Sequence, residues 1–396
     1  MTSDPFKPTL GVVFAGGGTG GHLFPALAIA EQLHERDPGV RCEFLCSERP
    51  LDRQILSEEG VRFTPIPARA FGLRPLILAN FLRGWAPSVR AARRSVRRLR
   101  DELREQGVDR LIVVAMGGFV SAPGARAAVL EKLPLVLVNL DATPGRANGW
   151  VARRAGTVFT AAEVKSRPTW RVVRPIVRSA AVADGDAAHC RRELGLDPAA
   201  RTLLVTGASQ GAKSINHLMM HLLETRPSRL MGWQVIHQCG PVVREGDRWT
   251  RDAIAQAYRQ AGLPALVVPL IREMGRAWGA ADLALSRCGA GSVAEAWANR
   301  VPTLFLPYPY HADQHQKWNA APLERVGAAV LRTDHIEPQA NAADAGETLL
   351  GLMDDPQRRQ DMRARLRELG PADGAGVIAE AILSRSTGAP GAAGQS

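Results

Sequence analysis

Apolar strand-like runs alternate with helix-like runs throughout this chain of 396 residues, and this alternation constrains the fold more than any other feature. In the first half, strand-like runs fall at residues 10–15, 40–46, 109–115 and 134–139, with helix-like runs at 24–36, 51–60 and 122–132. Strands that alternate with helices pair in parallel and carry helices on both faces of the sheet. We therefore expect an α/β fold built on parallel sheets.

The same opening occurs twice along the chain. Residues 10–22 and residues 201–213 each run from an apolar strand through a glycine-containing turn into a helix. This weak internal symmetry, in a chain too long for one ordinary core, predicts two similar α/β domains. The periodic pattern lapses at residues 174–188, so we place the domains at 1–178 and 179–385. Residues 386–396 are typical of a disordered tail.

The first turn contains a G-x-G-x-x-G pattern at Gly16, Gly18 and Gly21. Such a turn exposes backbone N–H groups at a helix N-terminus, where a diphosphate binds readily. The turn lacks the G-K-[ST] of a phosphate-binding P-loop, and Glu48 falls only roughly where a dinucleotide would need an acid. A nicotinamide or flavin enzyme remains an alternative, as does simple packing of the helix on the strand.

Two helix starts in the second half carry polar residues. In "TGASQGAKSIN", Ser209 and Gln210 could donate hydrogen bonds beside the loop amides, or cap the helix. In "SRCGAGSVAEAW", Ser292 and Glu295 have the S-x-x-E spacing of a capping box. The functional alternative is that Glu295 accepts hydrogen bonds from a ribose diol.

A third polar cluster, "HADQHQKWN", follows an apolar strand at residues 302–309 and includes Gln316 and Asn319. Polar residues at the carboxyl end of a strand are typical of a ligand crevice in an α/β sheet. The five cysteines are scattered, without zinc spacing, so we expect neither disulfides nor a structural metal.

Basic residues are concentrated in one segment. The net charge is +11, and residues 83–104 contain eight arginines directly after the apolar run "PLILANFL". The segment is either a solvated helix face or an amphipathic patch that binds an anionic membrane surface. Interleaved aromatic side chains are missing, which disfavours nucleic acid. We find no signal peptide and no membrane-spanning run, and expect a cytoplasmic location.

Five motifs together resemble the MurG family of N-acetylglucosaminyltransferases. They are, in order, "GGGTGGHLFPALAIAEQL", "MGGFVSAPGARAA", "GASQGAKSIN", "SRCGAGSVAEAW" and "HADQHQKWNAAPLERVGAA", and the similarity extends from about Leu10 to Leu331. The resemblance implies a GT-B fold: two Rossmann-like domains whose parallel sheets face an inter-domain cleft. It also implies an inverting transfer of GlcNAc from UDP-GlcNAc to the C4 hydroxyl of lipid I, undecaprenyl-diphospho-MurNAc-pentapeptide. The product would be lipid II for peptidoglycan, made at the cytoplasmic face of the membrane without a cofactor or protein-held metal.

The resemblance also implies roles for individual residues. It makes His22 a catalytic or phosphate-contacting candidate in the cleft, Ile271 a backbone contact to uracil, and Gln316 a ligand of the GlcNAc hydroxyls. The full substrate-binding set that we expect is Thr19, Gly20, Gly21, Asp141, Arg178, Ser209, Gln210, Ile271, Ala290, Gly291, Ser292, Val293, Ala294, Glu295, Gln316 and Asn319.

The chain departs from the family on the acceptor side. Where the family has H-E-Q-N-G, this chain reads "VNLDA", so Asn139 replaces a glutamate and Asp141 replaces an asparagine. Asn139 cannot act as a base, and we therefore expect Asp141 or His22 to accept the proton of the acceptor hydroxyl. The family's G-N-P-V-R segment reads "RPIVR" here. Two alternatives stay open: a related nucleotide-sugar transferase with another lipid or small acceptor, and a catalytically silent UDP-sugar-binding scaffold.

Overall fold

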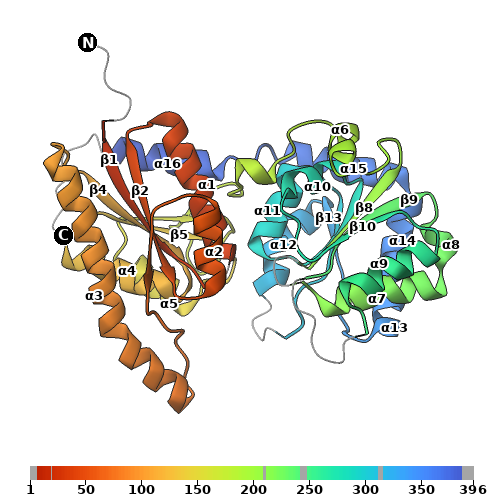
Figure 1. The fold of residues 1–396 in the computed structure, drawn as a ribbon, viewed down its shortest axis with the longest axis horizontal. Coiled ribbons are helices and arrows are strands. Elements are labelled where there is room, and N and C mark those ends of the chain that lie inside the picture. Colours follow the sequence, from red (N-terminus) through yellow and green to blue (C-terminus); the bar gives the residue numbers. More distant parts are fainter. Residues whose placement is uncertain (1–6, 19, 208–210, 241–247, 311–314, 386–396) are drawn as a thin grey trace, which may run out of the picture. The chain divides into compact units, whose positions relative to one another are not determined.

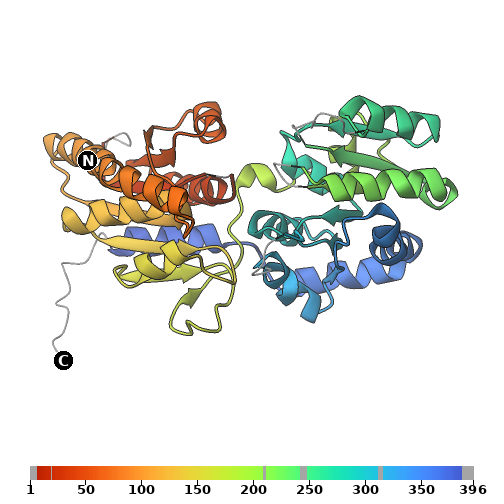
Figure 2. The same cartoon turned by 90° about the horizontal axis from the view of Figure 1, so that it is seen from below.

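The computed structural model describes residues 7–18, 20–207, 211–240, 248–310 and 315–385. These residues form two compact units, which are drawn in two orientations in Figures 1 and 2. Unit 1 contains the chain up to Arg178 together with the segment from Asp373 onward, and unit 2 contains Ser179–Ala372. Each unit is an α/β sandwich around one parallel sheet.

Unit 1 is built on a seven-stranded sheet in the order β3-β2-β1-β4-β5-β6-β7, with every paired strand parallel. The strands are β1 (Leu10–Gly16), β2 (Val40–Ser47), β3 (Phe63–Ile66), β4 (Leu111–Gly117), β5 (Leu135–Asn139), β6 (Thr157–Thr160) and β7 (Arg171–Val172). The helices are α1 (Gly20–Arg36), α2 (Pro50–Glu58), α3 (Pro75–Glu105), α4 (Gly118–Leu130), α5 (Arg146–Ala152) and α16 (Gly374–Arg385).

Unit 2 repeats this plan with a six-stranded parallel sheet in the order β10-β9-β8-β11-β12-β13. The strands are β8 (Arg201–Thr206), β9 (Trp233–Gln238), β10 (Ala265–Val268), β11 (Leu283–Ser286), β12 (Thr303–Phe305) and β13 (Ala329–Leu331). The helical segments are η1 (Ser179–Ala181), α6 (Ala187–Glu193), α7 (Lys213–Thr225), α8 (Pro227–Leu230), α9 (Arg251–Gln260), α10 (Met274–Ala280), α11 (Ala290–Ala298), α12 (His315–Arg325), α13 (Pro338–Asn341), η2 (Ala342–Gly346), α14 (Glu347–Asp354) and α15 (Pro356–Glu368).

Helices cover both faces of each sheet, because strands buried on two sides need apolar partners on both. In unit 1, α3, α4 and α5 pack together over one face, whereas α1, α2 and α16 lie together on the other. In unit 2, α7, α9 and α14 contribute to one core, and α10, α11, α12 and α15 to the other. The expected α/β fold with two parallel-sheet domains is confirmed.

The last described helix belongs to unit 1. The sequence places residues 179–385 in one domain, but α16 packs along α1. Gly374 makes this return possible, because a Cβ there would lie 2.0 Å from the carbonyl oxygen of Arg174. The apolar face of α16 is satisfied by a helix that lies more than 300 residues earlier, and local sequence patterns do not encode that choice.

Both sheets have the same strand order relative to their first strand, and this order positions the candidate site. In each sheet the chain first builds outward on one side of the opening strand, β1 or β8, and then crosses to its other side, at β4 or β11. Ligands of open α/β sheets bind at the carboxyl ends of the strands beside this reversal. No helix among the described residues is long and apolar enough to cross a membrane.

Candidate functional site

In unit 1, three adjacent strands deliver the predicted acceptor-side residues to one edge of the sheet. The glycine loop follows β1, Gly117 and Gly118 join β4 to α4, and Asp141 follows β5. His22 lies in the first turn of α1, directly after Gly20, which is buried, and Gly21, which is exposed. Thr19 lies outside the described residues. The sheet therefore collects His22 and Asp141 at the reversal point between β1 and β4 and on the neighbouring strand.

The imidazole of His22 packs directly on the backbone of the β4–α4 junction. A Cβ on Gly117 would lie 3.0 Å from Cδ2 and 3.1 Å from Nε2 of His22. Gly117 also has a φ of 97°, a conformation that side chains rarely adopt, so glycine is required there for two reasons. Burial lowers the pKa of His22, while the charges of Asp141 and Asp52 act to raise it. The ring is therefore neutral at pH 7, the form that can accept a proton.

Asn139, which replaces the glutamate of the family, is fully buried and fully engaged. Its Nδ2 donates to the backbone oxygen of Asp141 at 2.7 Å and to Oγ1 of Thr160 at 3.0 Å. Its Oδ1 accepts a hydrogen bond from Nδ2 of Asn148 at 2.8 Å. The side chain of Asn139 thus fixes the turn that carries Asp141 and links it by hydrogen bonds to Thr160 and Asn148.

Asn148, on α5, is a residue that sequence reasoning missed. It is 8% exposed, and its Oδ1 has no hydrogen-bond partner in the described part of the chain. A Cβ on Gly117 would lie 3.3 Å from this oxygen and 3.1 Å from Nε2 of His22, so both atoms line the same small space. A buried acceptor without a partner beside a candidate base is unusual and makes Asn148 a further residue of the candidate site. Only its position after the altered "VNLDA" turn could have indicated it.

Arg178, predicted to bind substrate, is held by two carboxylates of unit 1. Its Nε donates to Glu31 at 2.8 Å, and its two terminal nitrogens donate to Glu59 at 2.6 and 2.7 Å. The arginine side chain is only 14% exposed. Arg178, the last residue of the first segment of unit 1, is therefore anchored to α1 and to the end of α2. A role in substrate binding stays a prediction.

In unit 2, the predicted donor-side turn forms the start of α11, directly after β11. The N-cap of this helix is Gly289, so Ser292 is not the capping residue and the capping-box interpretation is wrong. Ser292, Val293 and Ala294 are buried, whereas Ala290 and Gly291 are partly exposed at the N-terminus. A helix N-terminus of this length, at the carboxyl edge of a parallel sheet, is suited to a diphosphate.

Glu295 lies one turn into α11 and receives a hydrogen bond from Nε1 of the buried Trp278 at 2.9 Å. Burial raises the pKa of its carboxyl group to about 7, an effect that the hydrogen bond from Trp278 partly offsets. Glu295 remains partly accessible. Its carboxyl group is thus oriented by one partner and can still accept hydrogen bonds from a ligand.

The third polar cluster reaches the same edge of the sheet in unit 2. On α12, Asn319 donates to the backbone oxygen of Cys288, just before α11, at 3.5 Å. Oε1 of Gln316 accepts the backbone N–H of Tyr308 at 3.0 Å. Both predicted residues therefore join α12 to the loops that follow β11 and β12. Residues 311–314 of this cluster lie outside the described residues.

The remaining donor-side predictions have different outcomes. The backbone N–H of Ile271 donates to Oε1 of the buried Gln238 at 3.0 Å, so this N–H is already engaged. Any contact of Ile271 with a base would have to use another atom. Ser209 and Gln210 lie outside the described residues, and their roles stay predictions.

A buried ion pair that sequence reasoning missed supports the edge of the second sheet. Arg287, directly after β11, pairs with Asp334 at 2.7 Å and donates to Ser214 of α7 at 2.8 Å. It also donates to the backbone oxygen of Leu306, after β12, at 3.0 Å. Burial would raise the pKa of Asp334, but the Arg287 charge and the hydrogen bonds outweigh it and hold that pKa below its usual range. The network ties together the segments that carry the donor-side residues.

The arginine-rich segment, residues 83–104, makes up most of α3, and five of its eight arginines are in ion pairs. Arg93, Arg97 and Arg100 converge on Glu131, whose pKa falls because these pairs outweigh its burial. Arg98 binds the buried Glu43, and Arg104 pairs with Asp109. Of the eight arginines, Arg83, Arg90 and Arg94 have no ion pair with another described residue. The sequence could not separate these three from the five that stabilise unit 1.

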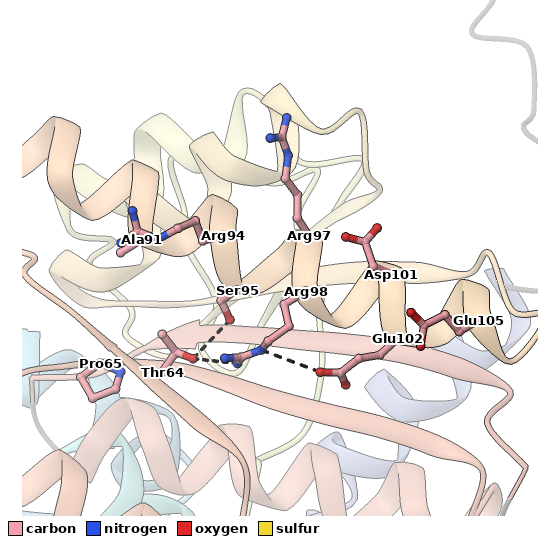
Figure 3. A pocket seen from close by; sticks show the side chains of 10 residues that line it. All are labelled: Thr64, Pro65, Ala91, Arg94, Ser95, Arg97, Arg98, Asp101, Glu102 and Glu105. Carbon is pink, nitrogen blue, oxygen red and sulfur yellow. Dashed lines mark hydrogen bonds and ion pairs between the residues drawn. The ribbon is translucent and has the colours of Figure 1, made fainter.

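A pocket of about 730 Å³ opens between α3 and β3 (Figure 3). Figure 3 shows Arg98 reaching toward Thr64 and Glu102, whereas Arg97 points away from the strand. None of the residues that line it belongs to the set predicted from the sequence: Thr64, Pro65, Ala91, Arg94, Ser95, Arg97, Arg98, Asp101, Glu102 and Glu105. The pocket mixes three arginines with three acids and is separate from the candidate site of unit 1.

The first turns of α3 extend beyond the sheet of unit 1 (Figure 1). Several apolar side chains in and just before these turns are exposed. We call Leu73, Leu76, Ile77 and Leu82 the α3 apolar patch; they are 71%, 74%, 39% and 63% exposed. The buried residues of α3 begin only at Ser88, so this patch takes no part in the core. Large apolar side chains that are this exposed are candidates for an interaction surface.

The chain resembles known proteins over almost all of its length. Residues 12–160 match the glycosyltransferase family 28 N-terminal domain, and residues 202–369 match the family 28 C-terminal domain. A protein of Acidothermus cellulolyticus is 36% identical, with 94% of this chain and 96% of the relative covered. A protein of Streptomyces collinus is 32% identical, with 94% and 99% covered. Both are named UDP-N-acetylglucosamine–N-acetylmuramyl-(pentapeptide) pyrophosphoryl-undecaprenol N-acetylglucosamine transferase.

Solved structures agree with this comparison. The crystal structure of MurG from Acinetobacter baumannii is 25% identical and has a TM-score of 0.66, with 95% of this chain and 99% of that chain covered. The calicheamicin glycosyltransferase CalG4 has a TM-score of 0.60 at 16% identity, over 96% of this chain and 100% of that chain, which supports the fold alone. The expected GT-B fold is confirmed.

Proposed function

The chain belongs to the MurG family within glycosyltransferase family 28, and on this premise we propose that it catalyses the reaction that its relatives are named for. It transfers N-acetylglucosamine from UDP-GlcNAc to lipid I and so produces lipid II for peptidoglycan. The observation that carries this assignment is near-full-length identity of 31–36% to transferases of this name, together with an intact donor-side motif set in unit 2.

Unit 2 supplies the groups for the donor. The N-terminus of α11 faces the carboxyl edge of its sheet, where it stabilises a diphosphate and, as the bond to GlcNAc breaks, the charge on the departing UDP. Glu295, held by Trp278, accepts hydrogen bonds from the ribose diol. Gln316 and Asn319 lie on α12 and join it to the loops after β11 and β12. Gln316 binds the GlcNAc hydroxyls, and Asn319 belongs to the same substrate-binding set.

Unit 1 supplies the base for the acceptor. The C4 hydroxyl oxygen attacks C1 of GlcNAc, the C1–O bond to UDP breaks, and the hydroxyl proton passes to the base. The neutral imidazole of His22 is suited to accept this proton, and the negative charge of Asp141 stabilises the imidazolium that results. Asn139 contributes by fixing the turn of Asp141.

The assay uses purified protein with UDP-GlcNAc and a soluble lipid I analogue, with the disaccharide-linked product as readout. Product formation supports the proposal, whereas donor hydrolysis or transfer to another acceptor contradicts the acceptor assignment. Donor binding without turnover indicates a silent scaffold. His22→Gln should slow transfer about a hundredfold, and Asp141→Asn should slow it about tenfold. If both variants keep full activity, the base lies elsewhere.

We also propose that the protein binds the cytoplasmic face of the cell membrane through the α3 apolar patch. Apolar side chains insert, and Arg83, Arg90 and Arg94 on the same helix, which have no ion pair with a described residue, attract anionic lipid. Aromatic side chains interleaved with the arginines are missing from residues 90–104 of this helix, so nucleic acid is not the expected partner of this surface.

Vesicle binding tests this part of the proposal independently of activity. Leu76→Asp with Leu82→Asp should abolish binding to vesicles that contain anionic phospholipid. Arg90→Gln should weaken binding roughly fivefold, since each basic residue near the surface contributes about 1 kcal/mol. Arg104→Gln removes an equal charge that is paired with Asp109 and serves as the matched control. Vesicle binding whose affinity changes neither with salt concentration nor with these substitutions would contradict the proposal.

A further inference from the structure

Asp52, on α2, is a fully buried carboxylate beneath the glycine loop. Its Oδ2 accepts the backbone N–H of Gly18 at 2.7 Å, the backbone N–H of Ser47 at 3.0 Å and the hydroxyl of Ser47 at 2.6 Å. Its Oδ1 is buried without a hydrogen-bond partner in the described part of the chain. A carboxylate that is buried and only half satisfied is costly, so it needs an explanation.

The carboxylate fixes the conformation of the loop. Gly18 is held on both sides, because its N–H donates to Asp52 and its carbonyl oxygen accepts a hydrogen bond from Arg49. A Cβ on Gly17 would lie 2.6 Å from Oδ2 of Asp52, so a side chain there would displace the carboxylate. The N–H of Gly18 is therefore committed to Asp52 and is not available to a phosphate.

The loop in turn packs where His22 lies. A Cβ on Gly118 would be 2.8 Å from the carbonyl oxygen of Gly17 and 3.4 Å from Cε1 and Nδ1 of His22. The loop, the β4–α4 junction and the imidazole thus share one contact region. Asp52 holds the loop in this region, and through the loop it determines the wall against which His22 packs.

The charged groups around His22 come from different elements. Burial lowers the pKa of His22, and the charges of Asp141 after β5 and, to a smaller extent, of Asp52 on α2 act to raise it. The cation that binds the loop is Arg49, and the β4–α4 junction presents glycine backbone to the ring. Asp52 is the only one of the two acids that is fully buried, so its charge is the less screened by solvent.

We propose that Asp52 is a positioning residue for His22, which holds the glycine loop against the β4–α4 junction and supplies a buried negative charge beneath this loop. The consequence of this role of Asp52 for catalysis rests on the proposed function, in which His22 is the base. The effect of Asp52 on the pKa and packing of His22 does not rest on the proposed function.

The test measures His22 directly by NMR titration of the full-length protein, with the resonance identified among the nine histidines by its loss in His22→Gln. In Asp52→Asn the amide oxygen can still accept the hydrogen bonds of the loop, but the charge is gone. The titration midpoint of His22 should move at least about 0.5 pH unit lower. The acidic limb of the pH profile of kcat should move in the same direction, while the KM for UDP-GlcNAc stays within about twofold.

Asp101→Asn is the matched control, since Asp101 is an exposed acid on α3 of the same unit, and it should leave the midpoint unchanged. Asp52→Glu keeps the charge but displaces it from the loop, so kcat should fall at least about tenfold with the midpoint near that of the wild type. An unchanged His22 midpoint in Asp52→Asn overturns the inference. A shifted midpoint with an unchanged pH profile supports the inference about Asp52 and instead refutes His22 as the base.

Discussion

Glu295→Gln separates the binding role of Glu295 from its cost to stability. The carboxyl group has a pKa of about 7, so it is about one-tenth ionised at pH 6 and about nine-tenths ionised at pH 8. The diphosphate of UDP-GlcNAc is esterified at both ends and keeps its charge over this range. If the ionised form accepts the ribose hydrogen bonds, donor affinity should rise about tenfold from pH 6 to pH 8, which corresponds to about 1.4 kcal/mol.

The same pKa predicts an opposite effect on folding. Glu295 has an ordinary pKa of 4.5 in the unfolded chain and about 7 in the folded protein, so the folded state holds the proton more tightly. Its contribution to stability is present below pH 4.5 and is lost as pH rises through 7. The difference amounts to at most about 3 kcal/mol, an upper limit because the residue is partly accessible. Glu295→Gln should therefore stabilise unit 2 at pH 8 and have little effect at pH 5.

Two measurements on one variant check this reasoning. Calorimetric titration with UDP-GlcNAc at pH 6 and 8 should show the pH dependence in the wild type and its absence in Glu295→Gln. Hydrogen exchange of the α11 amides should report the stability difference at pH 5 and 8. The reasoning fails if donor affinity has the same pH dependence in both proteins, or if the variant is less stable than the wild type at pH 8.

Three further substitutions test contacts that only the structure reveals. Asn139→Glu restores the residue of the family, yet it should lower the stability of unit 1 by about 3 kcal/mol without raising activity. The reason is that a buried carboxylate cannot donate the two hydrogen bonds that the amide donates. Thermal unfolding and transfer assays test both expectations. Arg178→Met should lower the stability of unit 1 by about 2 kcal/mol, because Glu31 and Glu59 lose their partner. The KM for UDP-GlcNAc should stay within about twofold of the wild-type value. A rise in KM of about tenfold without loss of stability would instead support a role of Arg178 in substrate binding. Trp278→Phe keeps a buried aromatic ring but removes the N–H that is bonded to Glu295. The pKa of Glu295 should therefore rise, and the KM for UDP-GlcNAc at pH 7 should increase about fivefold. An unchanged KM would contradict the orienting role of Trp278.

The fold class followed from the sequence because strand and helix periodicities are local. Buried parallel strands need continuous apolar residues, and these are visible in segments such as 10–15 and 201–206. The repeated strand, glycine turn and helix also predicted two domains of similar design. The donor-side motif around Glu295 lies in one continuous segment, so its position at a helix start could be predicted, although its capping alternative could not be dismissed without the backbone.

The acceptor side was harder because its residues come from separate strands. His22 and Asp141 were predicted individually, but Asn139, Asn148 and Asp52 acquire their roles only through partners on neighbouring elements. The "VNLDA" change looked like the loss of a catalytic group. In the structure, Asn139 holds the turn of Asp141 instead.

The sequence by itself determined the α/β architecture, the family and the donor-side motifs, because all of these are written in short contiguous segments. The tertiary structure alone decided that α16 returns to unit 1, that Arg178 is held by Glu31 and Glu59, and that five of the eight arginines of α3 are paired. Apart from the local Arg104–Asp109 pair, these outcomes depend on which distant segment of the chain lies alongside. The charge or polarity of a side chain determines what it can bind, but the fold determines which partner comes within reach.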